Sequence, residues 1–540
     1  MYSHGHSPSF LPSGRSCHFF GKMLRAAVVC LVISTLLLPA SGQQAGTSCT
    51  QPRVRKSWDA YNDTEKTLYK EAVGAAMTQG FHQKFVQIHT TYANALEAHK
   101  TCMFVYWHRM LLLGYENMLR SLHSSYACVT LPYWDHVSGS ALQAASSCST
   151  IETCSPIIAD FGGTTGLAKS LVVYNASITY TAKTTCVNQG LAGRFCGNNT
   201  GCAYCIMRTR SKYMGSYPAD AYFGSVYQQV FTYSEWDKVS SAIENGVHNS
   251  VHNALGGMMA YTQAPVDPVF YSHHALIDLL QTIYLKCQLG DAKTYLSAAG
   301  KASDPRFWSS CAKAGGGTFS GTDTITMRVT SANDSKTFVN VWQDANNMLY
   351  PFFKDLPYTY GDYIDAKDLG SYSYTYEIGG GLANMYQNCS ASNALTTSAG
   401  ASAALLASGK QGTVVKNAVL KRGKEPLSPT IAESTEEDDA TRRWSIALFE
   451  TAKMFGLEDW AAREQVETIT CLHHAECIGP VEDYSYLYRE NFGIEGHTRC
   501  FSIIGDLVAG TRVIAVPRWR EITRRFLPCP RRDGVDAEEE

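Results

Sequence analysis

Two groups of histidines place the strongest constraint on how this chain folds. One group is His248-Asn249-Ser250-Val251-His252, followed further along by His273-His274. Residues four apart on a helix lie about 40° from one another around its axis, so His248 and His252 share one helix face. Two imidazoles that project side by side can hold a single metal ion, and the His273-His274 pair offers a third. The pattern predicts a metal site built on helices.

The other group is His89, His99 and His108. His99 and His108 are nine residues apart, which places them on opposite faces of any continuous helix. They converge only if a bend or loop intervenes, with His108 in a second helix and His89 in a preceding one. No cysteine or carboxylate stands at ligand spacing within either group, and all-imidazole sites suit copper, zinc, iron or nickel.

Histidines also occur in proteins for reasons other than the site predicted above. A single histidine is more often a core or surface residue than a ligand, and two histidines four apart also occur in zinc hydrolases. His248 and His252 lack the glutamate that such hydrolases carry after the first histidine.

The other histidines are expected to be structural or exposed: His82, His123, His136 and His497, with His473-His474 at the surface beside a disulfide.

The first 42 residues are typical of a secretory signal peptide. Arg15, Lys22 and Arg25 precede an apolar run over 26–38, and Ala40-Ser41-Gly42 provides a small-residue exit. The alternative is a membrane anchor, but the run is shorter than the roughly 20 residues that a spanning helix needs. We therefore expect a secreted protein with no membrane segment after cleavage.

The cysteine count agrees with secretion. Eighteen cysteines are present, and cleavage after residue 42 removes Cys17 and Cys30 to leave an even number. An even count in an exported chain favours disulfides, although the sequence does not determine their pairing. The cluster Cys186, Cys196, Cys202 and Cys205 is similar to a zinc site, but disulfides are favoured there too. Sequons predict surface glycosylation at Asn62, Asn175, Asn198, Asn333 and Asn388.

Composition and texture indicate the domain organisation. The formal charge of −2 excludes a strongly basic nucleic-acid binder. Residues that favour helices dominate 56–125 and occur again around residues 233–253 and 272–287. Residues 138–205 have the composition of loops, and residues 318–341 favour a few short strands. We expect a large domain over 43–378, a linker with a dibasic processing site over 379–443, and a small C-terminal domain of undetermined class over 444–540.

Motifs around the histidines point to a known family. Ala98-His99 leads through Trp107-His108-Arg109 to Glu116, and Leu131-Pro132-Tyr133-Trp134-Asp135 follows. Beyond the second group stand Gly256-Gly257-Met258, Asp267-Pro268-Val269-Phe270 and then Asp278, four residues after His274. Over about residues 56–376 these motifs resemble the common central domain of tyrosinases, the type-3 copper proteins that include catechol oxidases and hemocyanins. Tyr358 and Tyr360 are similar to the tyrosine motif that closes this domain.

The resemblance implies a mainly α fold, in which a four-helix bundle houses a dicopper centre within a loop-rich periphery. It implies that copper A is held by His89, His99 and His108, and copper B by His248, His252 and His274. His273 would then lie behind the ligands, and Asp278, one turn after His274, is expected to orient a ligand imidazole. With O₂ as cosubstrate, such a centre hydroxylates small monophenols at the ortho position and oxidises o-diphenols to o-quinones, as in melanin formation.

The resemblance leaves the exact activity open. Some relatives carry a cysteine, crosslinked to the second copper-A histidine, where this chain has Glu97, so no crosslink is expected. Asn249 favours monophenol hydroxylation, because in the family this position is associated with a water that takes the phenol proton, and Glu244 is the nearest candidate for its partner glutamate. The alternatives are a catechol oxidase without that activity and an oxygen carrier of the hemocyanin type.

Relatives are often made as latent proenzymes, in which a C-terminal extension places a side chain in the entrance to the coppers. We expect the segment over 444–540 to act as such a cover, with an independent binding module as the alternative. The candidate plugs are Phe449, Phe455, Tyr484, Tyr486 and Phe492.

Overall fold

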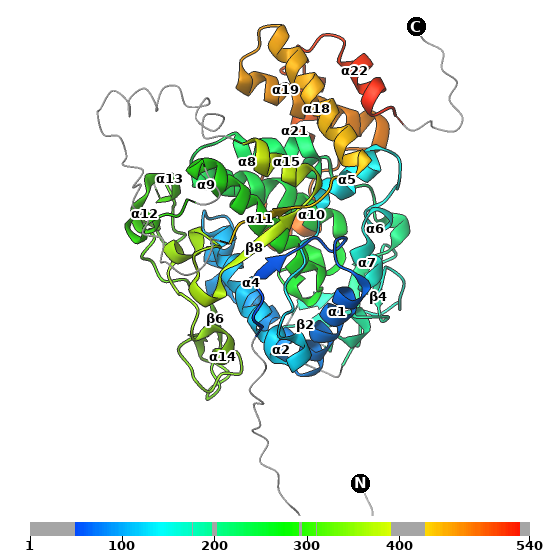
Figure 1. Cartoon of the computed structure of the whole chain (residues 1–540). Helices are drawn as coiled ribbons and strands as arrows, with labels where there is room; N and C mark the ends of the chain where they lie inside the picture. The colour runs from blue at the N-terminus through cyan, green and yellow to red at the C-terminus, as the bar shows by residue number, and fades with distance from the viewer. Residues whose placement is uncertain are drawn as a thin grey trace, which may run out of the picture. The chain divides into compact units, whose positions relative to one another are not determined.

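The computed structural model describes residues 49–174, 176–196, 202–290, 294–308, 310–389 and 427–529 (Figure 1). From Gly46 onward the chain forms one compact unit. The expected signal peptide, the sequons at Asn175 and Asn198 and the dibasic pair Lys421-Arg422 lie outside the described residues. No helix in the described part is long and apolar enough to span a membrane.

Helices dominate the described chain. The α-helices up to the second histidine group are α1 (Asp63–Thr78), α2 (Phe81–Thr90), α3 (Tyr92–Ala98), α4 (Phe104–Ser121), α5 (His136–Ala144), α6 (Ile151–Cys154), α7 (Pro156–Asp160), α8 (Phe223–Phe231), α9 (Trp236–Ile243) and α10 (Asn249–Leu255). They continue with α11 (Val269–Leu289), α12 (Ala298–Ser303), α13 (Pro305–Trp308), α14 (Tyr350–Phe353), α15 (Gly380–Asn388), α18 (Glu436–Met454), α19 (Asp459–His473), α20 (Tyr486–Phe492), α21 (Arg499–Val508) and α22 (Trp519–Phe526).

The strands are short, as expected. One sheet joins β1 (Arg53–Arg55), β8 (Tyr374–Ile378) and β9 (Thr430–Ile431) in parallel pairs. Three antiparallel hairpins are formed by β2 (Leu171–Val173) with β3 (Ala176–Ile178), β4 (Thr184–Val187) with β5 (Ile206–Thr209), and β6 (Arg328–Thr330) with β7 (Phe338–Asn340). The last hairpin lies where the sequence predicted strands. The residues 138–205, predicted as loops, also contain α5 to α7 and the hairpin β2–β3, because short elements there have too few residues to show a period.

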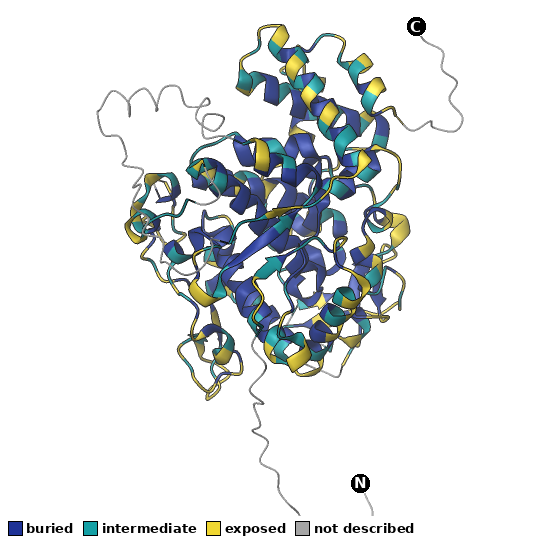
Figure 2. Cartoon of the chain, in the orientation of Figure 1, coloured by how far each residue is buried: buried dark blue, intermediate teal, exposed yellow. Residues whose placement is uncertain are grey.

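Four helices form the bundle around the histidines: α2, α4, α10 and α11. The middle of α4 is buried on every side, and so is nearly all of α11 (Figure 2). A helix that is apolar all round belongs in the interior of a protein, and α4 contacts α11 along the core. The mainly α bundle predicted from the sequence is therefore present.

A kink in front of α10 sets the direction of the second histidine group. Glu244–His248 form a π-helical turn, and Gly246 within it has ψ −117°, which breaks the helix between α9 and α10. A Cβ at Gly246 would stand 2.3 Å from Oε1 of Gln229, and that oxygen accepts the Val247 N–H at 2.8 Å. Glycine at 246 thus permits the close approach, and π-helical turns of this kind often mark functional sites.

Disulfides join all sixteen cysteines in the described part, in agreement with the expectation for an exported chain. The pairs are Cys49–Cys128, Cys102–Cys311, Cys148–Cys154, Cys186–Cys205, Cys196–Cys202, Cys287–Cys389, Cys471–Cys500 and Cys477–Cys529. The cluster of four that resembled a zinc site is thus two disulfides.

The C-terminal segment over 427–529 is helical and contacts the rest of the unit through α18 and α19. Helix α18 packs on α5 and α15, and α19 packs on α8. The residues 379–443, predicted as a linker, have a helix at each end, because α15 occupies 380–388 and α18 begins at Glu436; residues 390–426 lie outside the described part.

One local prediction in this segment was wrong. His473 and His474 are buried rather than at the surface, with 2% and 1% of their area exposed. Nε2 of His473 lies 3.1 Å from the Leu527 carbonyl, and Nε2 of His474 lies 2.8 Å from the Tyr217 carbonyl. These two polar rings can be buried because each is hydrogen-bonded to a backbone carbonyl.

Candidate metal centre

The first histidine group comes from three successive helices. His89 lies near the end of α2, His99 directly follows α3, and His108 lies in the first turns of α4. Their ring centroids are 5.0 to 5.6 Å apart, and one ring nitrogen of each lies within 4.8 Å of those of the other two. The break between α3 and α4 brings together the two histidines that a continuous helix would have separated, as predicted.

The second histidine group comes from two helices, α10 and α11. His248 and His252 project from the start of α10, with ring centroids 4.6 Å apart, and His273 and His274 project from α11. One nitrogen of each of these four rings lies within 4.8 Å of the others. Nδ1 of His273 lies 2.8 Å from Nε2 of His136, so one nitrogen of His273 has a partner behind the group.

Acceptors on the far side of the rings determine which nitrogen is free. Nδ1 of His89 donates to the Thr262 carbonyl at 2.6 Å, and Nδ1 of His108 donates to the Phe104 carbonyl at 2.8 Å. Nδ1 of His252 donates to the Met259 carbonyl at 2.8 Å. A carbonyl oxygen only accepts, so Nδ1 carries the hydrogen and Nε2 keeps its lone pair.

The fourth ring follows the same rule through a side chain. Nδ1 of His248 donates to Oδ1 of Asn249 at 2.9 Å. Among the described residues, the Nε2 atoms of His89, His108, His248, His252 and His273 are buried without a hydrogen-bond partner, and so are both nitrogens of His274. Buried polar atoms are nearly always satisfied, so this concentration of free lone pairs needs a ligand.

Electrostatics keep the imidazoles neutral. Burial lowers the pKa of His89 and of His252 to about 4. Burial, followed by the charge of neighbouring histidines, holds the pKa of His99, His248 and His274 well below the ordinary value. Neutral imidazole is the form that binds a transition metal.

The two groups face each other across the bundle. The rings of His108 and His274 are stacked with their centroids 4.1 Å apart, and the centroids of His99 and His248 are 6.4 Å apart. Phe270 lies beside His89 and His274, and Phe104 lies beside His248. Two sets of free imidazole nitrogens in an apolar surround fit a pair of copper ions, whose preferred protein ligands include imidazole.

Asp278 does not have its predicted role. We expected it to orient a ligand imidazole, but its Oδ1 accepts from Nε of Arg109 at 2.5 Å and its Oδ2 from the hydroxyl of Tyr374 at 2.5 Å. Oδ2 also accepts from Nη1 of Arg55 at 3.3 Å and from the Tyr376 hydroxyl. A carboxylate among two buried guanidinium groups pairs with them first, because unpaired buried charges are very costly.

Of the tyrosines near the end of the domain, Tyr374 and Tyr376 bind Asp278, whereas Tyr358 and Tyr360 do not. Tyr374 and Tyr376 come from β8, while Tyr360 donates to Glu97 at 2.6 Å and Tyr358 is half-exposed.

Glu244 and Asn249, the two residues predicted to handle a proton, both lie at the second group. Glu244 is in the π-helical turn one helical turn before His248, and its Oε1 accepts the Lys100 N–H at 2.8 Å. Burial raises the pKa of Glu244 to about 8. Besides the His248 ring, Asn249 contacts Asn245, to which its Nδ2 donates at 3.3 Å.

The C-terminal segment reaches the histidines through α20. The Phe492 ring lies 5.9 Å from the His99 ring and 6.3 Å from the His252 ring, so it touches both groups. The Tyr488 hydroxyl donates to Oδ1 of Asn249 at 2.8 Å. Among the candidate plugs, Phe492 is the one in contact with the histidines; Tyr484 donates to the Asn245 carbonyl at 2.6 Å, and Phe455 and Tyr486 are exposed.

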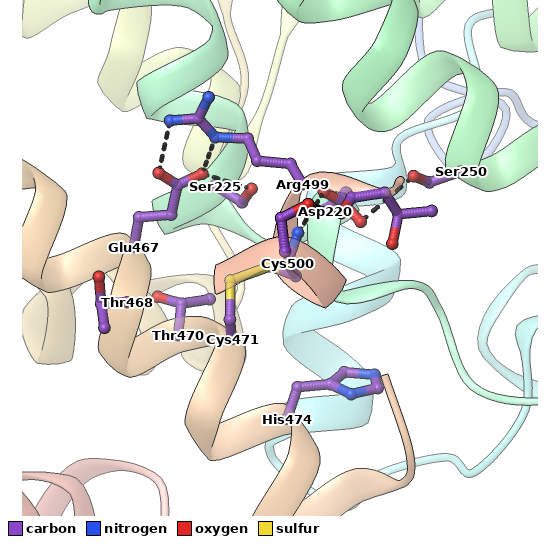
Figure 3. The surroundings of a disulfide bond; sticks show 12 residues. Asp220, Ser225, Ser250, Glu467, Thr468, Thr470, Cys471, His474, Arg499 and Cys500 are labelled. Carbon is purple, nitrogen blue, oxygen red and sulfur yellow. Dashed lines mark hydrogen bonds and ion pairs between the residues drawn. A yellow bond between two sulfur atoms is a disulfide. The ribbon is translucent and has the colours of Figure 1, made fainter. Parts of the chain in front are cut away.

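Polar contacts dock this segment on the bundle (Figure 3). The disulfide Cys471–Cys500 joins α19 to α21, and the Cys500 N–H donates to Oδ1 of Asp220 at 3.1 Å. Oδ2 of Asp220 accepts from Ser250, which lies between His248 and His252 in the sequence. On the other side Glu467 accepts from Ser225 of α8 at 3.0 Å and pairs with Arg499.

Sequence reasoning missed several residues that shape the site. The Thr262 carbonyl comes from a turn and the Met259 carbonyl from the short 3₁₀ helix Gly257–Ala260, neither of which the sequence analysis predicted. The Phe104 carbonyl is i−4 to His108 and follows from helix geometry. Tyr488, which contacts Asn249, was also missed because it lies far away in the sequence.

Comparison with known proteins finds relatives over the part of the chain that contains the two histidine groups. Residues 79–286, which include all six predicted ligands, match the family model of the common central domain of tyrosinase. A tyrosinase of Streptomyces glaucescens is 28% identical over 262 residues, which is 46% of this chain and 87% of that protein. A tyrosinase of Streptomyces antibioticus is 27% identical over 242 residues, which is 42% of this chain and 81% of that protein. Among solved structures, a polyphenol oxidase variant from Thermothelomyces thermophila is 17% identical and aligns with a TM-score of 0.37 over 61% of this chain and 91% of that one. Over residues 79–286 the chain matches the common central domain of tyrosinase, and it is similar to tyrosinases in that region.

Proposed function

We propose that this chain is a secreted type-3 copper oxidase that uses O₂ to hydroxylate small monophenols at the ortho position and to oxidise o-diphenols to o-quinones. The supporting observation is the pair of imidazole groups whose free Nε2 atoms meet in the bundle core. Copper bound there supplies the activation of O₂, while the protein supplies orientation and excludes water.

The ligand set that we propose is His89, His99 and His108 for copper A, and His248, His252 and His274 for copper B. His274 is preferred to its neighbour because its ring faces the first group, stacked on the ring of His108 with centroids 4.1 Å apart, although Nε2 of His273 is also without a partner in the described structure. His273 and His136 then support the site from behind.

The chain's own residues prepare the site for a phenol. The carbonyls of Thr262, Phe104 and Met259 hold three imidazoles with Nε2 directed into the centre. Phe270 and Phe104 keep the surround apolar, which suits a flat aromatic substrate. We propose that Asn249 and Glu244 handle the phenol proton, because Asn249 directly follows a proposed ligand and its amide oxygen accepts from Nδ1 of that ligand, while Glu244 lies one helical turn before it.

We also propose that the C-terminal segment is a cover that keeps the enzyme latent. Phe492 lies against both histidine groups, and Tyr488 occupies the amide oxygen of Asn249. Asn491 donates to the Ala260 carbonyl at 2.8 Å, and Nζ of Lys100 donates to the Gly493 carbonyl at 2.7 Å, so α20 is bound on two sides of the centre.

The activity is tested with copper-loaded protein and two substrates. We expect about two coppers per chain and, from protein whose C-terminal segment has been cleaved off, O₂ consumption with both tyramine and catechol, the former after a lag. Oxidation of catechol alone would indicate a catechol oxidase. Reversible O₂ binding without oxidation of either substrate by the cleaved protein would indicate an oxygen carrier and overturn the proposal.

The cover is tested by limited proteolysis. A protease that cuts between residues 390 and 426 should raise the rate on a bulky phenol and leave the copper content unchanged, because the cut separates the cover from the helices that carry the proposed ligands. Release of the segment after complete cleavage without any gain in rate would show that it is an independent module.

A further inference from the structure

The ring of His99 is the least supported of the proposed copper-A ligands. The His89 and His108 rings each have a backbone carbonyl behind them, but the described residues provide no hydrogen-bond partner for the His99 ring. His99 follows the last residue of α3 in extended conformation, and Lys100 after it is left-handed with φ 57°. The position of this imidazole therefore depends on how the end of α3 is held.

Glu97, two residues before His99, holds that end from outside the bundle. Its Oε2 accepts the Thr326 N–H at 2.7 Å, and its Oε1 accepts from the Thr326 hydroxyl at 2.6 Å. Oε2 also accepts from the hydroxyl of Tyr360 at 2.6 Å. Three donors on one carboxylate fix both of its oxygens.

The residues from Thr326 to Arg328 are also hydrogen-bonded to residues near the other two copper-A ligands. The Thr326 carbonyl accepts from Nε1 of Trp107, the residue before His108, at 2.8 Å. Asn94 of α3 exchanges two hydrogen bonds of 2.8 Å with the backbone of Arg328. Nδ2 of Asn94 also donates to the carbonyl of Ile88, the residue before His89, at 2.7 Å.

We infer that the extended segment Thr326–Arg328 is a template that sets the relative positions of the three copper-A ligands, with Glu97 as the positioning residue for His99. Each ligand has a neighbour in sequence that is hydrogen-bonded to this segment, directly or through Asn94. The segment lies outside residues 79–286, the part that matches the family domain.

The template is itself fixed. Met327 is fully buried, its N–H donates to Oδ1 of Asn340 at 3.0 Å, and its carbonyl accepts from the Val341 N–H at 3.0 Å. Anchored through the β6–β7 hairpin, the segment can resist a shift of α3 relative to α4. The inference rests on the proposed function only in naming the bound metal as copper.

The test is the rate at which a chelator removes copper from the whole protein. Glu97→Gln keeps the side-chain volume but replaces an acceptor oxygen with a donor, and Thr326→Val removes the hydroxyl donor. In both variants we expect one of the two coppers to leave about 10-fold faster than in the wild type, the usual cost of losing support behind a ligand, and the other to leave at the wild-type rate. Thr326→Ser, which keeps both donors, should restore the wild-type rate.

Glu65→Gln is the matched control. Glu65 also accepts three hydrogen bonds, from Asn62 and Lys56, but it lies on α1, which carries no ligand. We expect it to lower thermal stability without changing either copper-loss rate. Equal loss of both coppers from Glu97→Gln, or rates unchanged from the wild type, would overturn the template. A wild-type protein that holds two coppers but oxidises no phenol after cleavage would overturn only the proposed function, and one that holds no copper would overturn both.

Discussion

At the scale of single residues, the orientation of the imidazoles comes from neutral acceptors. Thr262, Phe104 and Met259 present carbonyls to Nδ1, and Asn249 presents its amide oxygen to His248. The nearby carboxylate of Asp278 is bound to Arg109 and Arg55 instead. An arrangement of neutral acceptors leaves each imidazole neutral, so the charge of the bound metal ions is not cancelled behind the ligands.

The assignment of copper B predicts the outcome of His252→Ala. The variant should retain at most one copper and lose oxidase activity, because oxygen activation requires both ions. The Met259 carbonyl loses its donor, at a cost of about 1–3 kcal/mol, so the chain should remain folded. Metal analysis and thermal unfolding check this, with His123→Ala, an exposed histidine away from the site, as the control. Two coppers and unchanged activity in His252→Ala would contradict the ligand set.

Asn249 should influence substrate choice more than metal content. In Asn249→Ala, measured on cleaved protein, we expect the rate on tyramine to fall about 10-fold or more and the rate on catechol to fall less, because only the monophenol must first lose its proton at this position. Asn249→Asp retains an acceptor oxygen for His248, so comparing it with Asn249→Ala distinguishes support of the His248 ring from handling of the phenol proton. Equal losses on both substrates in Asn249→Ala would indicate that the residue only supports the ring.

At the scale of elements, the junction of α5 and α18 contains an unusual carboxyl pair. The Ser138 hydroxyl lies 3.1 Å from Oδ2 of Asp135, on its own helix, and 3.0 Å from Oδ1 of Asp438 on α18. One hydroxyl has one hydrogen, so it cannot donate to two ionised carboxylates, and the second contact requires a proton on one of them. Gly380 closes the cluster, because a Cβ there would lie 2.5 Å from Asp438.

The pKa values at this junction predict that docking of α18 weakens as pH rises. Burial, and then the charge of Asp438, raises the pKa of Asp135 to about 7, and burial raises the pKa of Asp438. The charged group that also faces Asp135 is Asp59, and the remaining neighbours, Ser138, Thr435 and the Gly381 backbone, are neutral. Undocking returns both carboxyls toward their ordinary values near 4. Docking is therefore strongest below about pH 4, weakens as the pH rises through 7, and is constant above that.

The measurement is the activity of intact protein divided by that of cleaved protein, which cancels the pH dependence of the chemistry. The ratio should rise from pH 5 to pH 8 in the wild type and rise less in Asp438→Asn. Some dependence should remain, because burial also raises the pKa of Asp220, at the α21 contact, to about 6. The control is Glu437→Gln, since Glu437 contacts only the exposed Ser147 among described partners. A ratio that falls with pH would contradict the expected sign.

At the scale of the whole molecule, the C-terminal segment is attached to the bundle at several separate points. Asp438, Glu467, Cys500 and Tyr488 each contact a different part of the central domain. Because these contacts are separated, loss of one side chain should leave the segment docked while changing what lies over the histidine groups.

Phe492→Ala therefore tests the plug without removing the cover. The remaining contacts of α20 persist, and the lost ring opens a path between His99 and His252, so intact protein should oxidise catechol faster than the wild type does. After cleavage the two proteins should be equally active. Phe455→Ala, which removes an exposed phenylalanine of the same segment, should change neither rate. An intact Phe492→Ala variant as slow as the wild type would assign the block to another side chain.

Local spacing was enough to predict much of this protein. The i, i+4 pair His248 and His252, the break needed between His99 and His108, and the helices around them follow from 3.6 residues per turn. The even cysteine count predicted disulfides, and the described part has them. These features depend on residues that are close in sequence, where geometry leaves few choices.

Only the tertiary structure decided the contacts between distant residues. It paired Asp278 with Arg109 and Arg55, buried His473 and His474, placed the Phe492 ring against the histidines, and brought Thr326 to Glu97 and Trp107. Each of these contacts joins segments that the chain brings together only when the core closes. The energy that selects them comes from burying many groups at once rather than from any local pattern.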